Sequence, residues 1–453
     1  MNYQNQSDVV VLGAGIAGLS AALTLVQKGK KVVLLEKMNE IGGASAMAGG
    51  GSLVVNSRYQ PTLHKQDEAT KLKEAIMEYG HNLNHEPTVD LFVNHVGESF
   101  DWLTDKNGGN VEYHISENGK NFGAKGRGIQ VVKTLANRFV ELGGQLIKNV
   151  EVKQLIIEKE CVVGVLYQRD NKSVALYSPA VILASGGYGN NKAFIQEHIT
   201  RFVYAGAKGA CGDAIVLTKP LNAKCINMEH VNVQPNSIVM PSGLGQFANP
   251  GVNRAYRTSG AFLINQDGKR FINEMGNTWN LVQAMKANQS TYLLMDETAF
   301  NAFNQGMFNM QVYQEKDVQT WLKNHGKSNP LMIKADSIET MQAYLVSKNT
   351  LKKTIEKYNE GVKLDQDEYG REILYPLNTK EPIYLIQMWL RYYASLGGLQ
   401  VNQQFQVVNK EHQPIKGLYA AGEVIGGLCG DIYYPGSLLS WAFTSGHMVA
   451  KYL

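Results

Sequence analysis

The sequence has few cysteines and no long block of one charge. Four of its 453 residues are cysteine, and none stands in the CxxC or CxxCH spacing of zinc, redox or c-type haem sites. We therefore expect buried thiols, with neither a metal site nor a disulfide framework. The 44 basic and 40 acidic residues give a net charge of only +4, and no run of five or more like charges occurs. Nothing in this balance favours a nucleic acid partner.

Only one apolar segment, residues 9–26, raises the question of a membrane span. Its eighteen residues carry no charge, and this length is the usual minimum for crossing a bilayer. Glycines interrupt the segment, however, and its first part is short and β-branched, so we expect no integral membrane segment. The first eight residues hold Asp8 and neither Lys nor Arg, which disfavours a secretory signal. We expect a cytoplasmic protein.

The segment is typical of a strand, a tight turn, a helix and a second strand. Residues 9–12 predict a strand, residues 19–27 a helix ending at Gly29, and residues 31–35 the second strand. Glu36 follows, 18 residues after the last glycine of the turn, and fits the acidic position that binds a ribose. This order predicts a nucleotide-binding site.

Each glycine of the Gly-Ala-Gly-Ile-Ala-Gly turn has a physical task. Gly13 permits the tight turn, Gly15 lets the backbone approach a pyrophosphate, and Gly18 lets the helix pack closely on the strand. The helix N-terminus then offers free N–H groups to the diphosphate. Glu36 favours an unmodified ribose, because its carboxylate would repel a 2′-phosphate, and both NAD and FAD satisfy that requirement.

Three further glycine-rich segments favour FAD over NAD. Residues 40–51 come shortly after Glu36 in the sequence. Residues 181–189 and 417–424 repeat the pattern of an apolar strand that leads into glycines. A flavin that stays bound throughout turnover needs backbone close to its ribityl chain and ring, and small residues permit this approach. We therefore expect FAD, held non-covalently, in a site built from distant parts of the chain.

Over nearly its full length, the chain resembles the FAD-dependent fumarate reductase and succinate dehydrogenase flavoprotein superfamily. The motifs that carry the resemblance are GAGIAG at 13–18 with Glu36, GGASAMAGG at 42–50, ILASGGYG at 182–189, NQDGKRFINE at 265–274, SLGGLQVN at 395–402 and GLYAAGEVIGG at 417–427. The superfamily includes urocanate reductases and 3-ketosteroid dehydrogenases. The chain resembles the ketosteroid dehydrogenase-like branch more than the true fumarate reductases.

The resemblance implies an α/β fold, in which a Rossmann-like FAD-binding domain carries an inserted α+β capping domain. The FAD-binding domain would comprise residues 1–238 and 376–453. Residues 239–375 would form a helix-rich, mobile cap that closes over the reactive face of the flavin. Within this cap, residues 337–359 predict an amphipathic helix and residues 363–371 a polar loop.

The resemblance also implies the cofactor contacts. Glu36 would bind the adenosine ribose, the backbone of Val152 the adenine, and Glu423 the ribityl chain. The full set of implied contacts is Gly13, Gly15, Ala17, Gly18, Glu36, Lys37, Gly43, Ala44, Ser45, Ala48, Gly49, Gly50, Val152, Ala184, Ser185, Gly186, Gly422, Glu423, Ser437 and Leu438.

Two groups among these residues would meet the flavin ring. Ser45, Ala48 and Gly49 would line the isoalloxazine, although a helix cap is an alternative role for Ser45. Ser437 and Leu438, at an expected helix start, would face its pyrimidine end. A helix N-terminus there would stabilise the anionic reduced flavin.

The chain departs from dicarboxylate reductases at three cationic positions. Where those enzymes carry the proton-donating arginine in a Thr-Arg-Asp run, residues 275–280 read MGNTWN. Ala394 stands where they have a histidine before a Gly-Gly pair, and residues 429–433 read CGDIY in place of His-Gly-x-Asn-Arg. The clamp for two carboxylates and the proton donor are both missing. Fumarate and succinate are therefore not expected as substrates.

Tyrosines near the end of the chain are the candidate catalytic residues. Tyr433 and Tyr434 precede Pro-Gly and so resemble a Tyr-Pro-Gly of ketosteroid dehydrogenases; Tyr434 would polarise a substrate carbonyl, and Tyr433 is a candidate for proton transfer. Tyr393 is a candidate substrate contact. Aromatic packing is the alternative for each in a chain with 22 tyrosines. Thr278 and Leu438 replace a tyrosine and a glycine of the ketosteroid pattern, so a steroid is not expected.

A substrate carboxylate could be held by other cations. Arg127 and Lys125 lie in the glycine-rich segment GAKGRGIQ before a helix, which the family places near the substrate, and Arg127 is a candidate substrate contact. Arg254, Arg257 and Arg391 are further candidates. A solvated surface charge is the plainer interpretation of each.

We expect an FAD-dependent oxidoreductase that moves hydride between flavin N5 and a C–C bond next to a carbonyl or similar activating group, as an enone or enoate reductase or as a dehydrogenase. Two alternatives stay open: a carboxylic-acid enzyme of the tricarballylate or urocanate kind, with Arg127 or Arg391 as anion clamp, and a flavin-binding protein without catalysis. No second nucleotide motif for NADH and no haem or iron–sulfur ligand pattern is evident. The expected partners are a small-molecule substrate and an external electron donor or acceptor.

Overall fold

The computed structural model of the chain describes residues 6–60, 65–116 and 122–453. Internal contacts divide the chain into two compact units. Unit 1 comprises Met1–Gln196, Gly206–Asn232 and Tyr393–Leu453, and unit 2 comprises Glu197–Ala205 and Val233–Tyr392. The domain limits predicted from the sequence lie after residues 238 and 375, whereas two of these unit borders lie inside the strands named β13 and β18 below.

Unit 1 is built on a six-stranded sheet in the order β20-β21-β10-β1-β2-β6. Neighbouring strands are parallel, except that β20 runs antiparallel to β21. Val10 pairs with Val33 on one side and with Val181 on the other, and all three are buried. Burial on both faces is typical of parallel sheets and explains the continuous apolar runs. The strands are β1 (Val9–Leu12), β2 (Val32–Leu35), β6 (Gln145–Ile147), β10 (Val181–Leu183), β20 (Gln406–Val408) and β21 (Pro414–Ala420).

The strand order reverses at β1. From β1, the chain builds β2 and β6 on one side of the sheet and β10 and β21 on the other. In open α/β sheets, ligands bind outside the carboxyl ends of the strands at such a switch point. The glycine turn at residues 13–18 begins there, and the predicted α/β fold with a Rossmann-like sheet is confirmed.

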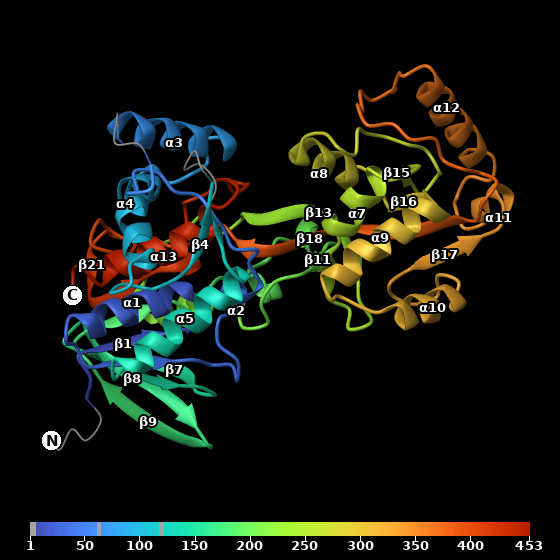
Figure 1. Ribbon diagram of the computed structural model, residues 1–453. Helices are drawn as coiled ribbons and strands as arrows, with labels where there is room; N and C mark the ends of the chain where they lie inside the picture. Colours follow the sequence, from blue (N-terminus) through green and yellow to red (C-terminus); the bar gives the residue numbers. More distant parts are fainter. Residues whose placement is uncertain (1–5, 61–64, 117–121) are drawn as a thin grey trace. The chain divides into compact units, whose positions relative to one another are not determined.

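Helix α1 starts three residues earlier than the helix predicted over residues 19–27. Ile16 N, in its first turn, donates a hydrogen bond of 3.1 Å to Ser45 Oγ. A side chain distant in sequence thus satisfies an amide that the local pattern leaves open. α1 packs against α5 and α13 (Figure 1). The helices of unit 1 are α1 (Ile16–Gln27), α2 (Gly43–Met47), α3 (Lys65–Tyr79), α4 (Glu86–Thr104), α5 (Arg127–Glu141), α6 (Asp213–Thr218) and α13 (Ser437–Val449).

Three small sheets complete unit 1. Two of them are antiparallel and three-stranded, in the orders β3-β5-β4 and β7-β8-β9, and the third is the pair β12-β19. Their strands are β3 (Gly51–Ser52), β4 (Tyr113–Ile115), β5 (Phe122–Ala124), β7 (Glu151–Glu158), β8 (Cys161–Arg169), β9 (Lys172–Tyr177), β12 (Cys225–Ile226) and β19 (Gly398–Leu399).

Unit 2 contains a seven-stranded sheet in which β18 is the central strand. The main path is β14-β13-β18-β16-β15, and β11 and β17 also pair with β18. Its strands are β11 (Val203–Tyr204), β13 (Val231–Val239), β14 (Gly245–Phe247), β15 (Ala261–Asn265), β16 (Thr291–Asp296), β17 (Met332–Ala335) and β18 (Ile383–Ser395). Its helices are α7 (Asn249–Tyr256), α8 (Thr278–Lys286), α9 (Glu297–Asn309), α10 (Glu315–Lys323), α11 (Ile338–Gln342) and α12 (Leu351–Lys363).

The single helix predicted over residues 337–359 is wrong, because α11 and α12 are separated there by a non-helical stretch. Within that stretch, Val346 N donates to Gln266 O at 2.9 Å. Lys348 Nζ donates to two carbonyls just after the end of α11, each at 3.0 Å. These tertiary and capping hydrogen bonds use backbone groups that a continuous helix would need.

The polar loop predicted at the end of this region has two buried charges. Arg371 is only 2% exposed, and Asp367 accepts a hydrogen bond from Arg270 Nη1. Arg270 also donates to Glu274, from Nε at 2.7 Å and from Nη2 at 2.9 Å. The motif NQDGKRFINE therefore supplies two charges to a buried ion network of unit 2.

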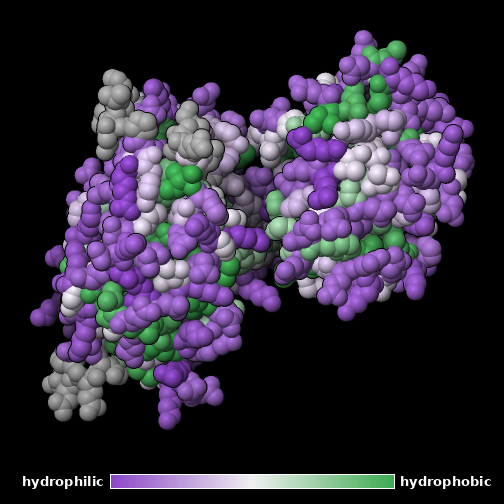
Figure 2. Space-filling model, viewed as in Figure 1, coloured by the Kyte–Doolittle hydropathy of each residue, from purple (hydrophilic) through white to green (hydrophobic). Residues whose placement is uncertain are grey.

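The face shown in Figure 2 is mainly hydrophilic, with hydrophobic residues in smaller groups. Among the residues that the structure describes, no helix has both the length and the apolar character needed to cross a membrane. Within the same part of the chain, no cluster of three or more His, Cys, Asp or Glu side chains is arranged to hold a metal ion.

The four cysteines are free thiols. Cys429 is buried, as expected. The expectation of a buried thiol is wrong for the other three, which are half-buried: Cys161, Cys211 and Cys225.

Candidate cofactor and substrate site

The glycine turn packs tightly against the end of β10. A Cβ atom on Gly18 would overlap Gly13 O, and one on Gly13 would overlap Ala184 O. Gly13 also has a φ of +105°, a region that side chains disfavour. The backbone of the turn therefore lies against the segment that carries Ala184 and Ser185, both predicted cofactor contacts.

Glu36, at the end of β2, closes the turn from the other side. Its Oε2 accepts a hydrogen bond of 2.8 Å from Ala14 N, and its Oε1 accepts one of 2.8 Å from Met38 N. Val150 N donates to Glu36 O at 3.1 Å, which brings the start of β7, with Val152, to the same edge. The carboxylate thus braces the turn, and each oxygen keeps acceptor capacity for a ribose hydroxyl.

Lys37 is neutralised by an acidic residue that the sequence reasoning missed. Its Nζ donates to Asp213 Oδ2 at 2.6 Å and to Gly209 O at 3.4 Å. Burial lowers the pKa of Lys37, but the hydrogen bond and charge of Asp213 outweigh this effect and raise the pKa. Asp213 begins α6, directly after the glycine-rich segment AKGACG, and that segment was the signal available.

The second glycine-rich loop forms the short helix α2 and the segment after it. A Cβ atom on Gly43 or Gly49 would meet no described atom within 4 Å, so both face open space. A Cβ atom on Gly50 would lie 3.1 Å from the Cα atom of Arg127. Gly128 N donates to Ala48 O at 3.0 Å. The predicted substrate contact Arg127, which is exposed, therefore lies beside the predicted flavin loop.

The segment after β10 has an unsatisfied polar atom. Ala184 N donates to Leu12 O at 2.8 Å, which ties the segment to β1. Ser185 Oγ is buried and has no hydrogen-bond partner among the described residues. A Cβ atom on Gly186 would meet no described atom within 4 Å. A buried hydroxyl beside open space is an expected feature of a ligand site.

The segment after β21 completes this edge of the sheet. A Cβ atom on Gly422 would lie 2.6 Å from the Cβ atom of Ala17, in the first turn of α1. The Oε1 atom of Glu423 accepts hydrogen bonds from Ser395 N at 2.9 Å and from Ser395 Oγ at 3.1 Å. Burial raises the pKa of Glu423, although the hydrogen bonds from Ser395 oppose this effect. Ser395 was missed, because its contact depends on the tertiary fold.

The start of α13 agrees with the helix start predicted at Ser437. Ser437 is buried and its N donates to Tyr434 O at 3.0 Å, whereas Leu438 is half-buried. Cys429 Sγ lies 3.9 Å from Ser437 Oγ, and burial raises the pKa of this thiol to about 12. The thiol beside the helix start is therefore neutral at physiological pH.

The residues at this edge fit FAD. The glycine turn, Glu36, Ser185 and Glu423 follow four neighbouring strands of the sheet, at the point where the strand order reverses. The open space at Gly43, Gly49 and Gly186 and the unsatisfied Ser185 Oγ are features that a bound dinucleotide would explain.

Four tyrosines of unit 1 form a cluster next to the start of α13. The rings of Tyr393 and Tyr433 lie 6.5 Å apart between centroids, at 82°. Tyr434 contacts Tyr79, at the end of α3, with centroids 5.3 Å apart and an angle of 68°. Burial raises the pKa of Tyr79, and Tyr433 and Tyr434 add to this effect. The sequence reasoning missed Tyr79, and no local pattern marks it.

The positions at which dicarboxylate reductases carry cations have other local roles in this chain. Asn277 Oδ1 caps α8, accepting from Trp279 N at 2.8 Å and from Asn280 N at 3.3 Å. Ala394 is 4% exposed. Each of these positions thus serves packing or helix capping.

The other candidate cations differ in exposure. Arg254 and Arg257 are exposed, and the exposed Lys125 forms an ion pair with Glu112 at 2.9 Å. The interpretation as a solvated surface charge is wrong for Arg391, which is 8% exposed and lies over the ring of Phe247 at 4.6 Å. Stacking on an aromatic face explains how this guanidinium is accommodated in a buried position.

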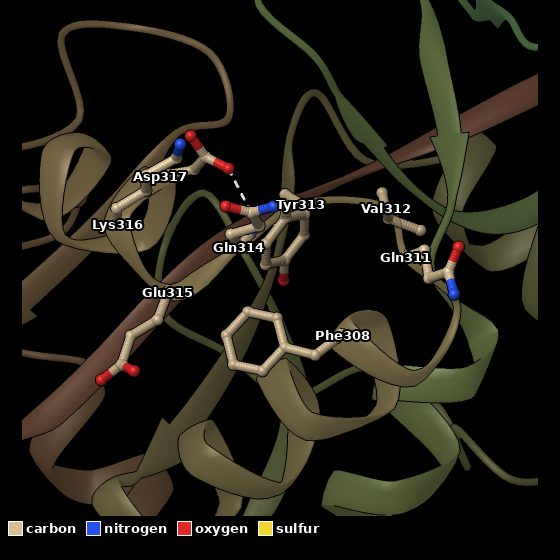
Figure 3. A pocket seen from close by; sticks show the side chains of 8 residues that line it. All are labelled: Phe308, Gln311, Val312, Tyr313, Gln314, Glu315, Lys316 and Asp317. Carbon is tan, nitrogen blue, oxygen red and sulfur yellow. Dashed lines mark hydrogen bonds between the residues drawn. The ribbon is translucent and has the colours of Figure 1, made fainter.

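A surface hollow in unit 2 lies between the end of α9 and the start of α10 (Figure 3). Asp317 Oδ2 accepts a hydrogen bond of 2.8 Å from Gln314 N and so caps α10. The hollow is lined by Phe308, Gln311, Val312, Tyr313, Gln314, Glu315, Lys316 and Asp317. These residues include none of the predicted cofactor or substrate contacts, and we assign the hollow no part in the site.

The curated proteins that are similar to this chain differ in length from one another. The NADH:fumarate oxidoreductase of Klebsiella pneumoniae is 27% identical over 98% of this chain, which spans only 48% of that protein's length. The vinyl phenol reductase of Lactiplantibacillus plantarum is 26% identical, over 97% of this chain and 94% of its own. Several other curated relatives are fumarate reductases.

Solved structures share the fold. The 3-ketosteroid delta1-dehydrogenase from Sterolibacterium denitrificans superposes with a TM-score of 0.82 and 17% identity, over 99% of both chains. At this identity the structural similarity supports only the fold. The expected resemblance to the ketosteroid dehydrogenase branch therefore stays a prediction. A profile of the FAD binding domain family matches residues 8–437. The chain therefore belongs to the FAD binding domain family, within the fumarate reductase and succinate dehydrogenase flavoprotein superfamily.

Proposed function

We propose that the chain is an FAD-dependent oxidoreductase that transfers hydride between flavin N5 and a C–C bond next to a carbonyl or similar activating group. Bound FAD would supply or accept this hydride. The observation that carries the proposal is the cluster of Tyr393, Tyr433 and Tyr434 beside the start of α13. Two of the relatives are named an NADH:fumarate oxidoreductase and a vinyl phenol reductase, and these names support chemistry at a carbon–carbon double bond.

Each tyrosine has a role in this proposal. The Tyr434 hydroxyl donates a hydrogen bond to the substrate carbonyl oxygen, where negative charge develops. Tyr433 moves a proton at the carbon that does not receive hydride. Tyr393 packs against Tyr433 and, as a half-buried ring, contacts the substrate.

A carboxylic-acid substrate is the second candidate, and one observation favours it. Arg127 lies beside Gly50 of the predicted flavin loop and is exposed. Of the two proposed anion clamps, Arg127 is the better one, because the Arg391 guanidinium already lies over Phe247. A single cation suits one carboxylate rather than two.

We infer that FAD is bound without a covalent bond and that electrons come from, or go to, a separate donor or acceptor. The predicted ring contacts Ser45, Ala48 and Gly49 carry neither the imidazole nor the thiol to which flavins can be linked. Denaturation of the purified protein in acid should release the flavin into the supernatant. Flavin that stays with the precipitate would contradict this inference.

An anaerobic reoxidation assay tests the proposed activity. The flavin is photoreduced and mixed with ethylideneacetone, a neutral enone, or with acrylate or fumarate, while its absorbance is followed. We expect the enone to reoxidise the flavin and fumarate to leave it reduced. Reoxidation by fumarate alone would contradict the argument from the missing cations. If none of the compounds reoxidised the flavin, the proposed activity would be wrong and the chain would be a flavin-binding protein without it.

A conservative variant tests the role of Tyr434. Tyr434→Phe keeps the ring but removes the hydroxyl, so we expect the rate of reoxidation by ethylideneacetone to fall about 100-fold, the usual effect of a lost proton-transfer or polarising group. Flavin content should not change. Tyr344→Phe, at a ring that is 41% exposed in unit 2, is the matched control. Equal rates for both variants would exclude the role.

A further inference from the structure

We propose that Tyr79 and Tyr434 form an aromatic wall of the substrate site and that this wall selects neutral alkenes conjugated to an aromatic ring. The inference rests on the proposed function and names its substrate class. It concerns unit 1 alone, in which all four clustered tyrosines lie.

The ring geometry leaves surface for a further ring. Tyr79 and Tyr434 meet edge to face at 5.3 Å, and both side chains are half-buried. The second pair, Tyr393 and Tyr433, has the same edge-to-face arrangement at 6.5 Å and is also half-buried. Both separations lie in the favourable range for aromatic pairs, about 4.5–7 Å. A planar substrate ring could therefore join the cluster by the same kind of contact.

Tyr79 is held in place by contacts that fasten the end of α3 to the loop before α13. The backbones of Gly80 and Gly430 touch so closely that a Cβ atom on Gly430 would overlap Gly80 O. Asn84 Nδ2 donates to Leu428 O at 2.8 Å. His81 Nδ1 lies 2.7 Å from Asp431 Oδ1. The wall is therefore preorganised, which reduces the entropy lost on binding.

The cluster lies between two segments predicted to contact the flavin. Tyr434 O accepts the hydrogen bond from Ser437 N at the start of α13. Tyr393 is two residues before Ser395, whose N and Oγ donate to Glu423. A ring bound against the tyrosines would thus place a conjugated double bond beside the predicted flavin ring, which carries N5.

The charges beside the wall disfavour an anionic substrate. The loop that carries Tyr433 and Tyr434 also carries Asp431, whose side chain is 23% exposed. Asp431 is paired with His81, which carries charge only when protonated. A substrate carboxylate would meet this acid, whereas a neutral aryl alkene would not.

Binding to the oxidised, FAD-loaded protein is the first test. Para-ethylphenol has the aryl ring but no reducible double bond, and butanone has neither; each is titrated while the flavin difference spectrum is recorded. We expect Tyr79→Leu to weaken para-ethylphenol binding about tenfold and Tyr79→Phe to change it by less than about threefold, because the ring provides most of the contact. Binding of butanone should stay within about twofold, and Tyr344→Leu is the matched control.

Measurements of turnover with two enones distinguish a failure of this inference from a failure of the proposed function. Benzylideneacetone and ethylideneacetone are matched enones with and without an aryl ring. We expect Tyr79→Leu to raise KM for benzylideneacetone about tenfold, with little change in kcat, and to leave ethylideneacetone unaffected. Equal effects on both enones, or a wild-type preference for the aliphatic one, would overturn the aryl wall but keep the proposed function. If neither enone reoxidises the flavin, both proposals fail.

Discussion

At the scale of single residues, the turn after β1 leaves no room for side chains. Gly18→Ala would place a methyl group against Gly13 O, and only movement of the turn relieves this overlap. We expect FAD affinity to fall at least about tenfold and the melting temperature by about 3 °C or more. Gly123→Ala is the matched control, because its Cβ atom meets no described atom within 4 Å. Unchanged FAD affinity in Gly18→Ala would contradict the assigned role of the turn.

Some residues of the site could be predicted, and others could not. The glycine turn and Glu36 lie within one short segment, so their spacing alone indicates their roles. Asp213, Ser395 and Tyr79 join the site only through contacts with residues more than 25 positions away. A single sequence does not show which distant residue each of them contacts, even where glycines mark the segment, as before Asp213.

At the scale of elements, the buried strands could be predicted more reliably than the helices of unit 2. Strands β1, β2 and β10 are short apolar runs buried on both faces, and burial leaves a clear pattern. The stretch between α11 and α12 has helix-compatible periodicity, yet Val346 bonds to Gln266 and the helix stops. Tertiary hydrogen bonds thus override a local preference.

The packing of α13 on α4 predicts a pH dependence of stability. The ring of His447 stacks on Trp102 at 4.6 Å and 7°, and its Nδ1 lies 3.1 Å from Ser99 Oγ. Burial lowers the pKa of His447 from 6.5 to about 3. The folded chain therefore keeps the ring neutral, whereas the unfolded chain binds a proton below pH 6.5. This contribution to stability is complete above pH 6.5 and is lost as the pH falls toward 3, by at most about 1.4 kcal/mol per pH unit.

Urea unfolding of the wild type and His447→Phe between pH 5 and 8 measures this effect. The variant keeps an aromatic ring on Trp102 but removes the titrating group, so its unfolding free energy should depend less on pH. His114→Phe, at an exposed position, should behave like the wild type. If the unfolding free energy depended on pH equally in all three proteins, His447 would not titrate as its burial requires.

At the scale of the whole molecule, every predicted cofactor contact lies in unit 1, although they come from both ends of the chain. The parallel sheet explains this convergence, because β1, β2, β10 and β21 present their carboxyl ends at one edge. The buried ion network of Arg270, Glu274 and Asp367 belongs to unit 2, although Asp367 lies in a segment predicted as a polar loop. Burial of charge depends on partners that the sequence places almost 100 residues apart.

The central claim is that unit 1 binds FAD through this edge of the sheet. Calorimetric titration of the flavin-free protein with FAD, with NAD as the matched dinucleotide, tests it most directly. We predict one FAD per chain, with a dissociation constant below about 1 μM, and NAD binding at least about 100-fold weaker. A protein that takes up no FAD, or that binds NAD as tightly, would contradict the account.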